Sequence, residues 1–475
     1  MMKYLDELLT GFRGCFSRKA AFQWFVVIVA GLLVRTDHLG VTSVIRGLTL
    51  SVDYVSLLGF FRSSAWTLEA LTAKWCELVK QYAPLVRHGD AVVMVGDGVK
   101  QAKEGRRMPG VKRQHQESED SSKAEYIWGH LFGGVGVLAE TARKCFCIPL
   151  ALRLQDGVKA IFGWDENKER QTSHVTEIIY LAYKVAKYFG KAILLLDRLY
   201  LTVPALLALD KVNVGGHIMH IVTKAKCNCT AFLPPKKTGR PGRPQKKGAK
   251  VKVLAFFENS KDQFTDAEVC LYGKMEKVRY LCIDLVWGRK LYKMLRFVLV
   301  EYGNTRTILV STDLMMQPLA IIKLYGRRFC IETMFREMKQ VICSFGYRFW
   351  SKYMPKLNRF KKKTDPDPLE QIVSQRAKNR ITLAVKAIEG FVFCATVATG
   401  LLQMISLRFS GTEELRHLRF LRTQRNSIIS EATVADFLRK NFFRLLMVCP
   451  DLTLTRIISA KQSQDIGPHE VPVAS

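Results

Sequence analysis

AVVMVGD at residues 91–97 and AILLLD at residues 192–197 are two short apolar runs, and each ends in an aspartate. A continuous apolar run of this length, closed by Gly or Asp, is typical of a strand buried on both faces. We therefore expect buried strands over 90–97 and 191–197 that end at Asp97 and Asp197. A carboxylate at the end of a buried strand is costly unless a cation or a hydrogen-bond donor lies beside it.

Further elements are expected around these strands. Strand candidates cover 125–139 and 145–154, a helix runs over 173–189, and a short helix covers 202–211. The order is therefore three strands, a helix, a strand and a helix. This order is typical of RNase H-like (retroviral-integrase-like) proteins, in which helices flank a mixed sheet, so we expect an α/β core of that class.

The chain is strongly basic. Its 475 residues carry 73 Lys and Arg against 42 Asp and Glu, a formal net charge of +31. Such a balance favours a polyanionic partner, with nucleic acid as the first choice and an anionic membrane surface as the second. The apolar runs at 20–34 and 390–402 are shorter than the roughly 20 residues of a spanning helix, so we expect buried helices and no membrane segment. The 12 cysteines lack zinc-finger spacing, which indicates free thiols in a reducing compartment.

YGRRFCIETMFREMK, residues 325–339, lies in a helix expected over 317–343. Four side chains share a stripe about 60° wide beside an apolar face when the helix is drawn at about 100° per residue: Tyr325, Arg328, Glu332 and Lys339. The stripe is either a solvated helix surface, since Arg328 and Glu332 form an i,i+4 pair, or one side of a functional site. Arg327 falls in the apolar arc, for which the sequence offers no reason.

Asp97, Asp197 and Glu332 together supply the oxygen ligands that Mg²⁺ prefers. Two such ions about 4 Å apart activate an attacking oxygen and stabilise the leaving oxygen during displacement at phosphorus. We therefore expect these three carboxylates to be catalytic and to hold two Mg²⁺ ions, with Mn²⁺ as a substitute. The three other members of the stripe would contact phosphate.

The spacing Y-x2-R-x3-E-x6-K of Tyr325, Arg328, Glu332 and Lys339 resembles the Tyr-Arg-Glu-Lys signature of a group of DDE transposases from bacterial insertion sequences. The stretch 197–200 (DRLY) resembles the D-x-x-[YF] around the second Asp of that group. A β-rich insertion before the Glu is also typical of the group. The resemblance covers residues 90–345.

This resemblance implies an RNase H-like core and metal-dependent DNA cleavage and strand transfer in the cut-and-paste transposition of an insertion sequence, often through a DNA hairpin. It also implies Mg²⁺, double-stranded DNA as element ends and target, a homodimer in the synaptic complex, and a place in the bacterial cytoplasm at the nucleoid. Two alternatives stay open: an RNase H-like nuclease that cuts DNA without joining it, and a non-catalytic DNA-binding protein derived from a transposase.

The chain is expected to divide into five regions. They are a helical N-terminal domain over 1–88, the first part of the RNase H-like core over 89–213, a β-rich insertion without helices over 214–304, the second part of the core with the Glu332 helix over 305–345, and a basic linker with a helical C-terminal region over 346–475. The N-terminal domain is either a helix-turn-helix module that binds DNA ends or a plain helical subdomain.

Two basic segments are candidate DNA contacts. The loop 232–250 contains GRPGRP at 239–244, which resembles an AT-hook core for a narrow minor groove; a flexible basic loop on phosphates is the alternative. In the segment 348–363, Trp350 either stacks on an unpaired base or belongs to the core. The expected DNA-binding residues are Tyr325, Arg328, Lys339, Arg240, Arg243, Trp350, Lys352, Lys356, Arg359, Lys361, Lys362 and Lys363.

Overall fold

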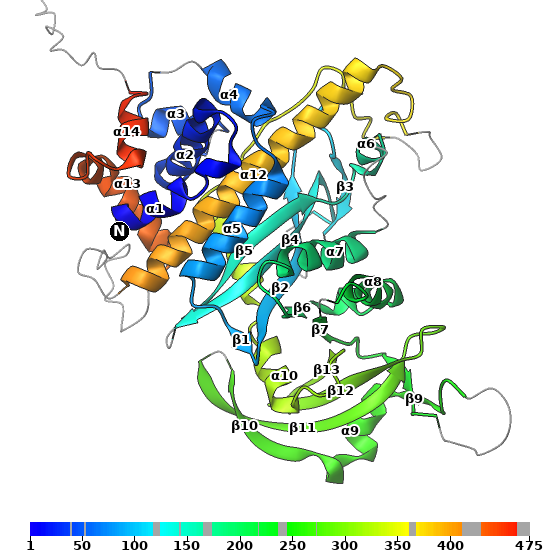
Figure 1. Cartoon of the computed structure of the whole chain (residues 1–475). Helices are drawn as coiled ribbons and strands as arrows, with labels where there is room; N and C mark the ends of the chain where they lie inside the picture. The colour runs from blue at the N-terminus through cyan, green and yellow to red at the C-terminus, as the bar shows by residue number, and fades with distance from the viewer. Residues whose placement is uncertain are drawn as a thin grey trace, which may run out of the picture.

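A mixed α/β architecture is built on one large sheet (Figure 1). The computed structural model describes the chain except for residues 39, 52–53, 117–123, 142–143, 165–172, 217, 236–244, 272, 361–366, 411–428 and 463–475. The strands of the first half are β1 (Arg87–His88), β2 (Ala91–Ala102), β3 (Lys112–His115), β4 (Tyr126–Thr141), β5 (Lys144–Leu154), β6 (Ala192–Leu195) and β7 (Met219–Lys224).

Five of these strands lie side by side in the order β5-β4-β2-β6-β7. The pairs β5–β4 and β4–β2 are antiparallel, whereas β2, β6 and β7 run parallel. Parallel neighbours need crossover connections, and helices α7 (His174–Ala186) and α8 (Val203–Asn213) fill that role. The strands expected at 125–139 and 145–154 and the helices expected at 173–189 and 202–211 are thus confirmed as β4, β5, α7 and α8.

Two strand boundaries differ from expectation. β2 does not end at Asp97 but continues to Ala102, because β4 keeps pairing with it along this length. β6 ends earlier, at Leu195, and Asp197 instead precedes the 3₁₀ turn η2 (Arg198–Tyr200). A Gly-Asp-Gly stretch is a turn signal in isolation, but pairing across the sheet overrides it here.

The second half of the sheet curls into a separate antiparallel layer (Figure 1). Its elements are β8 (Thr230–Phe232), β9 (Lys250–Lys252), η3 (Val253–Ala255), α9 (Phe256–Asn259), η4 (Lys261–Gln263), β10 (Thr265–Leu271), β11 (Lys274–Trp287), β12 (Lys293–Tyr302) and β13 (Thr305–Ser311). The insertion was expected to contain no helix, and that prediction is wrong: Phe257 is buried on the helical turn α9 in the core of this layer. A short apolar run cannot be assigned to strand or helix by its pattern alone.

β7 joins the two halves of the sheet. It pairs with β6 on one side and with β13 on the other. This segment was expected among the strands of the β-rich insertion, yet its parallel pairing with β6 makes it continuous with the strands that carry the two aspartates.

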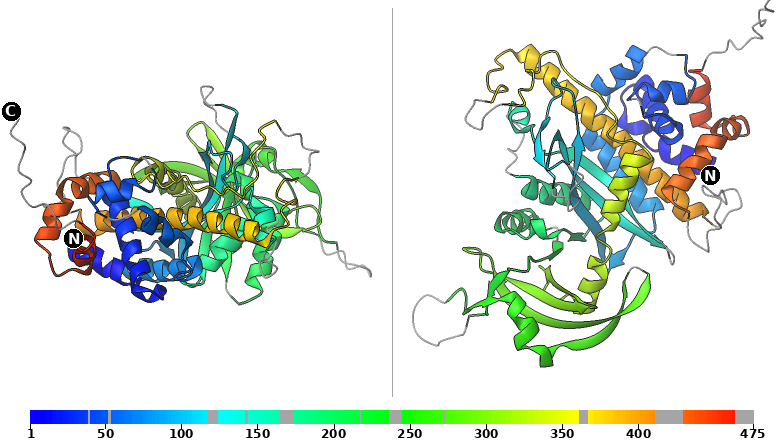
Figure 2. Two further views of the ribbon diagram at one scale, coloured as in Figure 1. Left: turned by 90° about the horizontal axis from the view of Figure 1, so that it is seen from above. Right: turned by 180° about the vertical axis from the view of Figure 1, so that it is seen from behind.

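Helices from both ends of the chain form one cluster (Figures 1 and 2). They are α1 (Met2–Thr10), η1 (Arg13–Cys15), α2 (Lys19–Val34), α3 (Ser43–Gly47), α4 (Tyr54–Arg62), α5 (Leu68–Tyr82), α12 (Gln375–Phe409), α13 (Glu431–Met447) and α14 (Thr453–Ser459). The short α6 (Lys159–Phe162) also contacts α12. The apolar run at 20–34 is in α2, which is buried among α3, α4, α12, α13 and α14.

α12 contains the second apolar run, 390–402. By length and composition it is the one described helix that could cross a membrane, and 78% of its apolar window is buried inside the protein. Its contacts with β5, α2 and α13 account for that apolar surface as core packing. Both apolar runs therefore lie in buried helices, as expected.

The helix expected over 317–343 is broken into α10 (Pro318–Tyr325) and α11 (Cys330–Gln340). Between them, residues 326–329 wind more tightly: Arg328 N donates to Tyr325 O and Cys330 N donates to Arg327 O, both three residues back. A side chain at Gly326 would approach Leu271 of β10 to 3.0 Å, so glycine permits the close packing at this break. Tyr325 and Arg328 consequently lie at a junction rather than on one straight helix.

Candidate active site

Neighbouring parallel strands bring Asp97 and Asp197 to the same edge. In the register of β2 and β6, Val95 is paired with Leu195. Asp97 comes two residues after Val95, and Asp197 comes two residues after Leu195. Both side chains are half-buried. Hydrophobic residues before them anchor the strands in the core, so the positions of both carboxylates are set by the sheet.

A glycine next to Asp97 lets α11 approach the sheet. Gly134 of β4 is the direct cross-strand partner of Asp97, so its missing side chain leaves space on the same face. The ring of Phe335 fills that space: a Cβ on Gly134 would lie 2.9 Å from two of its ring atoms. Glu332 is about one helical turn before Phe335 on the same side of α11. The packing of Phe335 against Gly134 therefore directs the Glu332 side chain toward Asp97.

Arg328 connects two of the three acids. Its Nη1 lies 3.4 Å from Oδ2 of Asp97, and its Nη2 donates to Oε1 of Glu332. The Arg328 side chain is only 14% exposed, whereas that of Glu332 is 57% exposed. Asp197 makes no side-chain hydrogen bond or ion pair within the described part of the chain, although its carboxylate is near enough to Asp97 to raise the pKa of that group.

The electrostatics of Asp97 reflect this crowding. Burial raises the pKa of Asp97 to about 6, and the negative charges of Asp197 and Glu332 act in the same direction. The backbone N–H of Gly98, 2.7 Å from Oδ1, and the guanidinium of Arg328 lower the pKa. Because the charged form is disfavoured, a cation placed among these carboxylates would be strongly attracted.

Two tyrosines border the acids. Tyr325 is half-buried, Tyr200 is buried, and burial raises the pKa of each phenol well above its ordinary value. Asp97 and Asp197 raise both pKa values further, which places both hydroxyls near the carboxylates. Both phenols therefore stay protonated and can donate a hydrogen bond at neutral pH.

Lys339, the last member of the stripe, joins α11 to β2. Its Nζ donates to the carbonyl of Lys100 at 3.1 Å, three residues beyond Asp97. Arg327, for which the sequence offered no reason, forms an ion pair with Glu140 of β4 in which Nη2 lies 2.6 Å from Oε2. No local pattern links these two residues, since they meet only through the packing of α11 on the sheet.

The donor set suits a hard divalent cation, because all three acids offer carboxylate oxygens. Among the residues that the structure describes, no three His, Cys, Asp or Glu side chains already surround a common point as metal ligands do. Arg328 occupies the space between Asp97 and Glu332, and the exposed Glu332 side chain can rotate away from it. The three carboxylates therefore have the right chemistry to bind a divalent cation. The Glu332 side chain must first rotate away from Arg328 to join the two aspartates as a ligand.

The remaining expected DNA contacts lie apart from the acids. Trp350 is 60% exposed, whereas its neighbours Tyr347 and Phe349 are buried in the core. Lys352, Lys356 and Arg359 are exposed along a segment that packs on residues 103–107, past the end of β2. The other expected contacts lie outside the described residues: Arg240, Arg243, Lys361, Lys362 and Lys363.

Sequence reasoning missed a buried arginine that ties α11 to the helical cluster. Arg35, 1% exposed at the end of α2, donates to the carbonyls of Ile342 at 2.6 Å and Cys343 at 3.1 Å. It also bonds Gly40 O and Ser43 Oγ. Burial lowers the pKa of Arg35 to about 10, so it remains charged at neutral pH. A single Arg after an apolar run carries no signal for this role.

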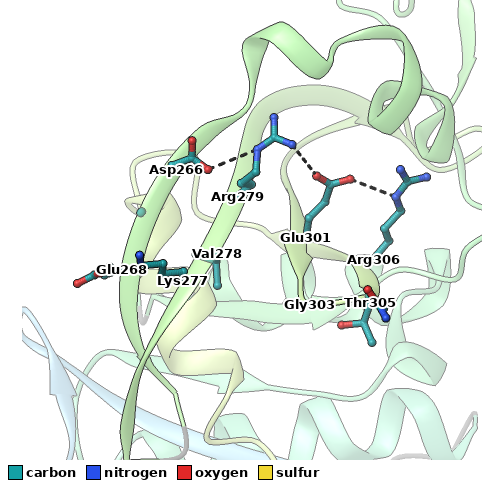
Figure 3. Close-up of a pocket in the computed structure, with 11 residues that line it drawn as sticks. Asp266, Glu268, Lys277, Val278, Arg279, Glu301, Gly303, Thr305 and Arg306 are labelled. Atoms are coloured by element: carbon teal, nitrogen blue, oxygen red, sulfur yellow. Dashed lines mark hydrogen bonds and ion pairs between the residues drawn. The ribbon is translucent and has the colours of Figure 1, made fainter.

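A further cavity lies away from the acids. It measures about 940 Å³ and is lined by residues of β10, β11, β12 and β13 in the curled layer. Figure 3 shows its charged side chains. Its charged side chains neutralise one another: Arg279 pairs with Asp266 and Glu301, and Glu301 also pairs with Arg306. Its described lining contains three acidic and three basic residues, so it carries no net formal charge.

Comparison with protein families supports a DNA-processing enzyme. Residues 11–155 match the family model described as DDE superfamily endonuclease. The matched segment contains Asp97 and ends before Asp197 and Glu332. No curated protein and no solved structure matches the chain. The match indicates an enzyme of the nuclease or transposase type, for which DNA is the implied substrate.

Proposed function

We propose that this protein is a DDE transposase that cleaves DNA strands and transfers them during cut-and-paste transposition of a bacterial insertion sequence. The observation that carries this proposal is that Arg328 lies between the carboxylates of Asp97 and Glu332, while Asp197 follows β6, the parallel neighbour of β2. The Tyr-Arg-Glu-Lys spacing and the match to DDE superfamily endonucleases support it from the sequence side.

The strand order supports an RNase H-like core within this proposal. The sequence of pairings β5-β4-β2-β6-β7, antiparallel at first and then parallel, agrees with the order of elements expected for that class. We also propose the five regions 1–88, 89–213, 214–304, 305–345 and 346–475, with β7 at the junction of the core and the insertion.

The carboxylates of Asp97, Asp197 and Glu332 would hold two Mg²⁺ ions, with Mn²⁺ as a substitute. When bound, such ions make the attacking water or 3′-hydroxyl more nucleophilic and stabilise the charge on the leaving oxygen. Asp97 and Asp197, anchored by their strands, would fix the geometry. Glu332 would complete it after releasing Arg328, because its side chain is exposed and free to turn.

Basic and phenolic groups of the same site would position the phosphate. Arg328, released from Glu332, presents a planar fork that matches two phosphate oxygens. Lys339 offers a compact positive charge, and Tyr325 a protonated hydroxyl. We propose that these three residues bind the DNA strand beside the bond that is cut. We further propose that the protein acts as a homodimer that brings two DNA ends together, in the bacterial cytoplasm.

A nuclease without joining activity is the second candidate, because the matching family is described only as endonuclease. A strand-transfer assay separates the two. Duplex DNA from either flank of the coding sequence supplies candidate ends, and pre-cut ends are incubated with target plasmid and Mg²⁺. A transposase joins the 3′ ends to the plasmid, and cleavage without joining would replace the proposal with the nuclease. Binding of DNA with neither reaction would leave only a DNA-binding protein.

A further inference from the structure

A second cavity, of about 510 Å³, lies between helix α4, the segment 348–353 and the first turns of α12. We call it the α4–α12 groove. This groove is distinct from the candidate active site, because none of Asp97, Asp197 and Glu332 lines it. The three segments that form it come from the helical cluster and from the chain that follows α11 (Figure 1).

Positive charge dominates this groove. Five exposed cationic side chains line it, and no Asp or Glu is among its described lining residues: Arg62, Arg348, Lys352, Arg376 and Arg380. None of the five forms an ion pair with an acid in the described ranges of the chain. Like charges held this close repel one another, and a bound polyanion would offset that repulsion.

The cavity in the curled layer provides an internal contrast. There Arg279 and Arg306 are each paired with Glu301, so the protein itself neutralises them (Figure 3). In the α4–α12 groove the protein supplies no such partner within the described residues. This difference indicates that the cationic side chains of the groove are available to bind an external anion.

Aromatic groups accompany the cations. Trp350 and Tyr54 line the groove and are 60% and 44% exposed. An exposed indole is costly in water and unusual beside buried neighbours such as Phe349. Cations that follow a backbone, with an aromatic ring beside them, are the combination that nucleic-acid grooves use.

Short connections link the groove to the candidate active site. Ser351 N donates to Arg107 O, and the buried Lys103 donates to the carbonyl of Tyr347 at 3.1 Å. Residues 103–107 directly follow β2, the strand that contains Asp97. The segment that contains Trp350 and lines the groove thus contacts the chain that continues β2 beyond Asp97.

We infer that the α4–α12 groove binds the sugar-phosphate backbone of the DNA substrate at a distance from the bond that is cut. This inference rests on the proposed function and deepens it: the groove is a docking site for duplex DNA built jointly by the N-terminal helices and α12. Arg62, Arg376 and Arg380, none of which belongs to the basic linker, become DNA contacts.

The test measures the affinity for a mixed-sequence DNA duplex over a range of salt concentrations. The variant Arg376→Gln/Arg380→Gln removes two charges one helical turn apart on α12. The matched control Lys440→Gln/Arg444→Gln removes the same two charges, also four residues apart, from α13. In a plot of the log of the association constant against the log of the salt concentration, each phosphate contact contributes about −0.9 to the slope. The slope of the groove variant should therefore be shallower by about two. The control should keep the slope of the unmodified protein.

One further variant and a check of folding keep the outcome decisive. Arg62→Gln, on a different helix, should reduce the slope by about one, and circular dichroism confirms that each variant is folded. If folded groove variants keep the affinity and slope of the control, the groove is not a DNA site. If the unmodified protein cuts and joins DNA while this happens, only the inference fails; if the unmodified protein binds no DNA, the proposed function fails with it.

Discussion

The guanidinium of Arg328 lies 3.4 Å from the carboxylate of Asp97, although 231 positions separate them in the chain. The same guanidinium also contacts Glu332. Arg328 thereby acts as an internal counter-ion for an acid group whose members would otherwise repel one another.

Removal of the counter-ion should destabilise the metal-free protein. Arg328→Gln leaves the half-buried carboxylate of Asp97 without its counter-ion, which should lower the free energy of unfolding by about 1–3 kcal/mol. Urea unfolding with EDTA measures the loss. Arg328→Lys, which keeps the charge, should lose less. Equal stability of Arg328→Gln and the unmodified protein would show that the ion pair has no role as a counter-ion.

The stability of the metal-free protein should depend on the charge of Asp97. Its pKa of about 6 in the folded state exceeds the ordinary value of 3.8, so the folded protein binds this proton more tightly than the unfolded chain does. Stability is therefore lost as the pH rises from about 4 to about 6. Asp97→Asn lacks this loss and should be more stable than the unmodified protein above pH 6, by about 1–3 kcal/mol.

Denaturant unfolding in EDTA at pH 4 and pH 7 checks this prediction. The difference between Asp97→Asn and the unmodified protein should widen toward pH 7. Asp262→Asn, at an exposed position, serves as the control and should show no such widening. A constant difference across the two pH values would contradict the proposed crowding of negative charge around Asp97.

The close packing of α11 on β4, where Phe335 lies against Gly134, should be necessary for activity. Gly134→Ala puts a methyl group 2.9 Å from the Phe335 ring, so α11 and Glu332 must shift. A displacement of about 1 Å can reduce a reaction rate by about 100-fold, so we expect a 10- to 100-fold loss of DNA cleavage with the fold retained. Gly14→Ala, where the new Cβ would meet nothing within 4 Å, should be fully active. Full activity of Gly134→Ala would mean that the position of α11 is not critical.

The buried Arg35 should hold α11 to the helical cluster. Arg35→Met keeps the apolar stem but leaves the carbonyl of Ile342 without its donor, while those of Gly40 and Cys343 keep the bonds from Ser43 Oγ and Gly346 N. The substitution should cost about 1–3 kcal/mol. Arg46→Met breaks an exposed ion pair with Asp37 and should cost less than about 1 kcal/mol. Thermal or urea unfolding compares the two, and equal losses would contradict a special role for Arg35.

The two aspartates could be located from sequence because each follows an uninterrupted apolar run. That local signal survives in the structure even though β2 continues past Asp97 and β6 stops before Asp197. Their shared edge depends on one parallel pairing, which the order of strands and helices was sufficient to suggest.

Contacts between distant segments were beyond the reach of sequence patterns. The break between α10 and α11 is set by packing of Gly326 on Leu271, and Arg327 finds Glu140 only because that break reorients it. A periodic helix drawn through these positions predicts the correct side of α11 for Glu332 but assigns Arg327 to the wrong surroundings.

Binding of Mn²⁺ tests the central claim most directly. Paramagnetic resonance can follow the ion with duplex DNA present, for the unmodified protein and for Asp97→Asn, Asp197→Asn and Glu332→Gln, with Asp262→Asn as the control. We predict that each of the three variants weakens Mn²⁺ binding by more than about tenfold while the control does not. Unchanged binding in any of the three would show that its carboxylate is not a ligand and that the site has been placed wrongly.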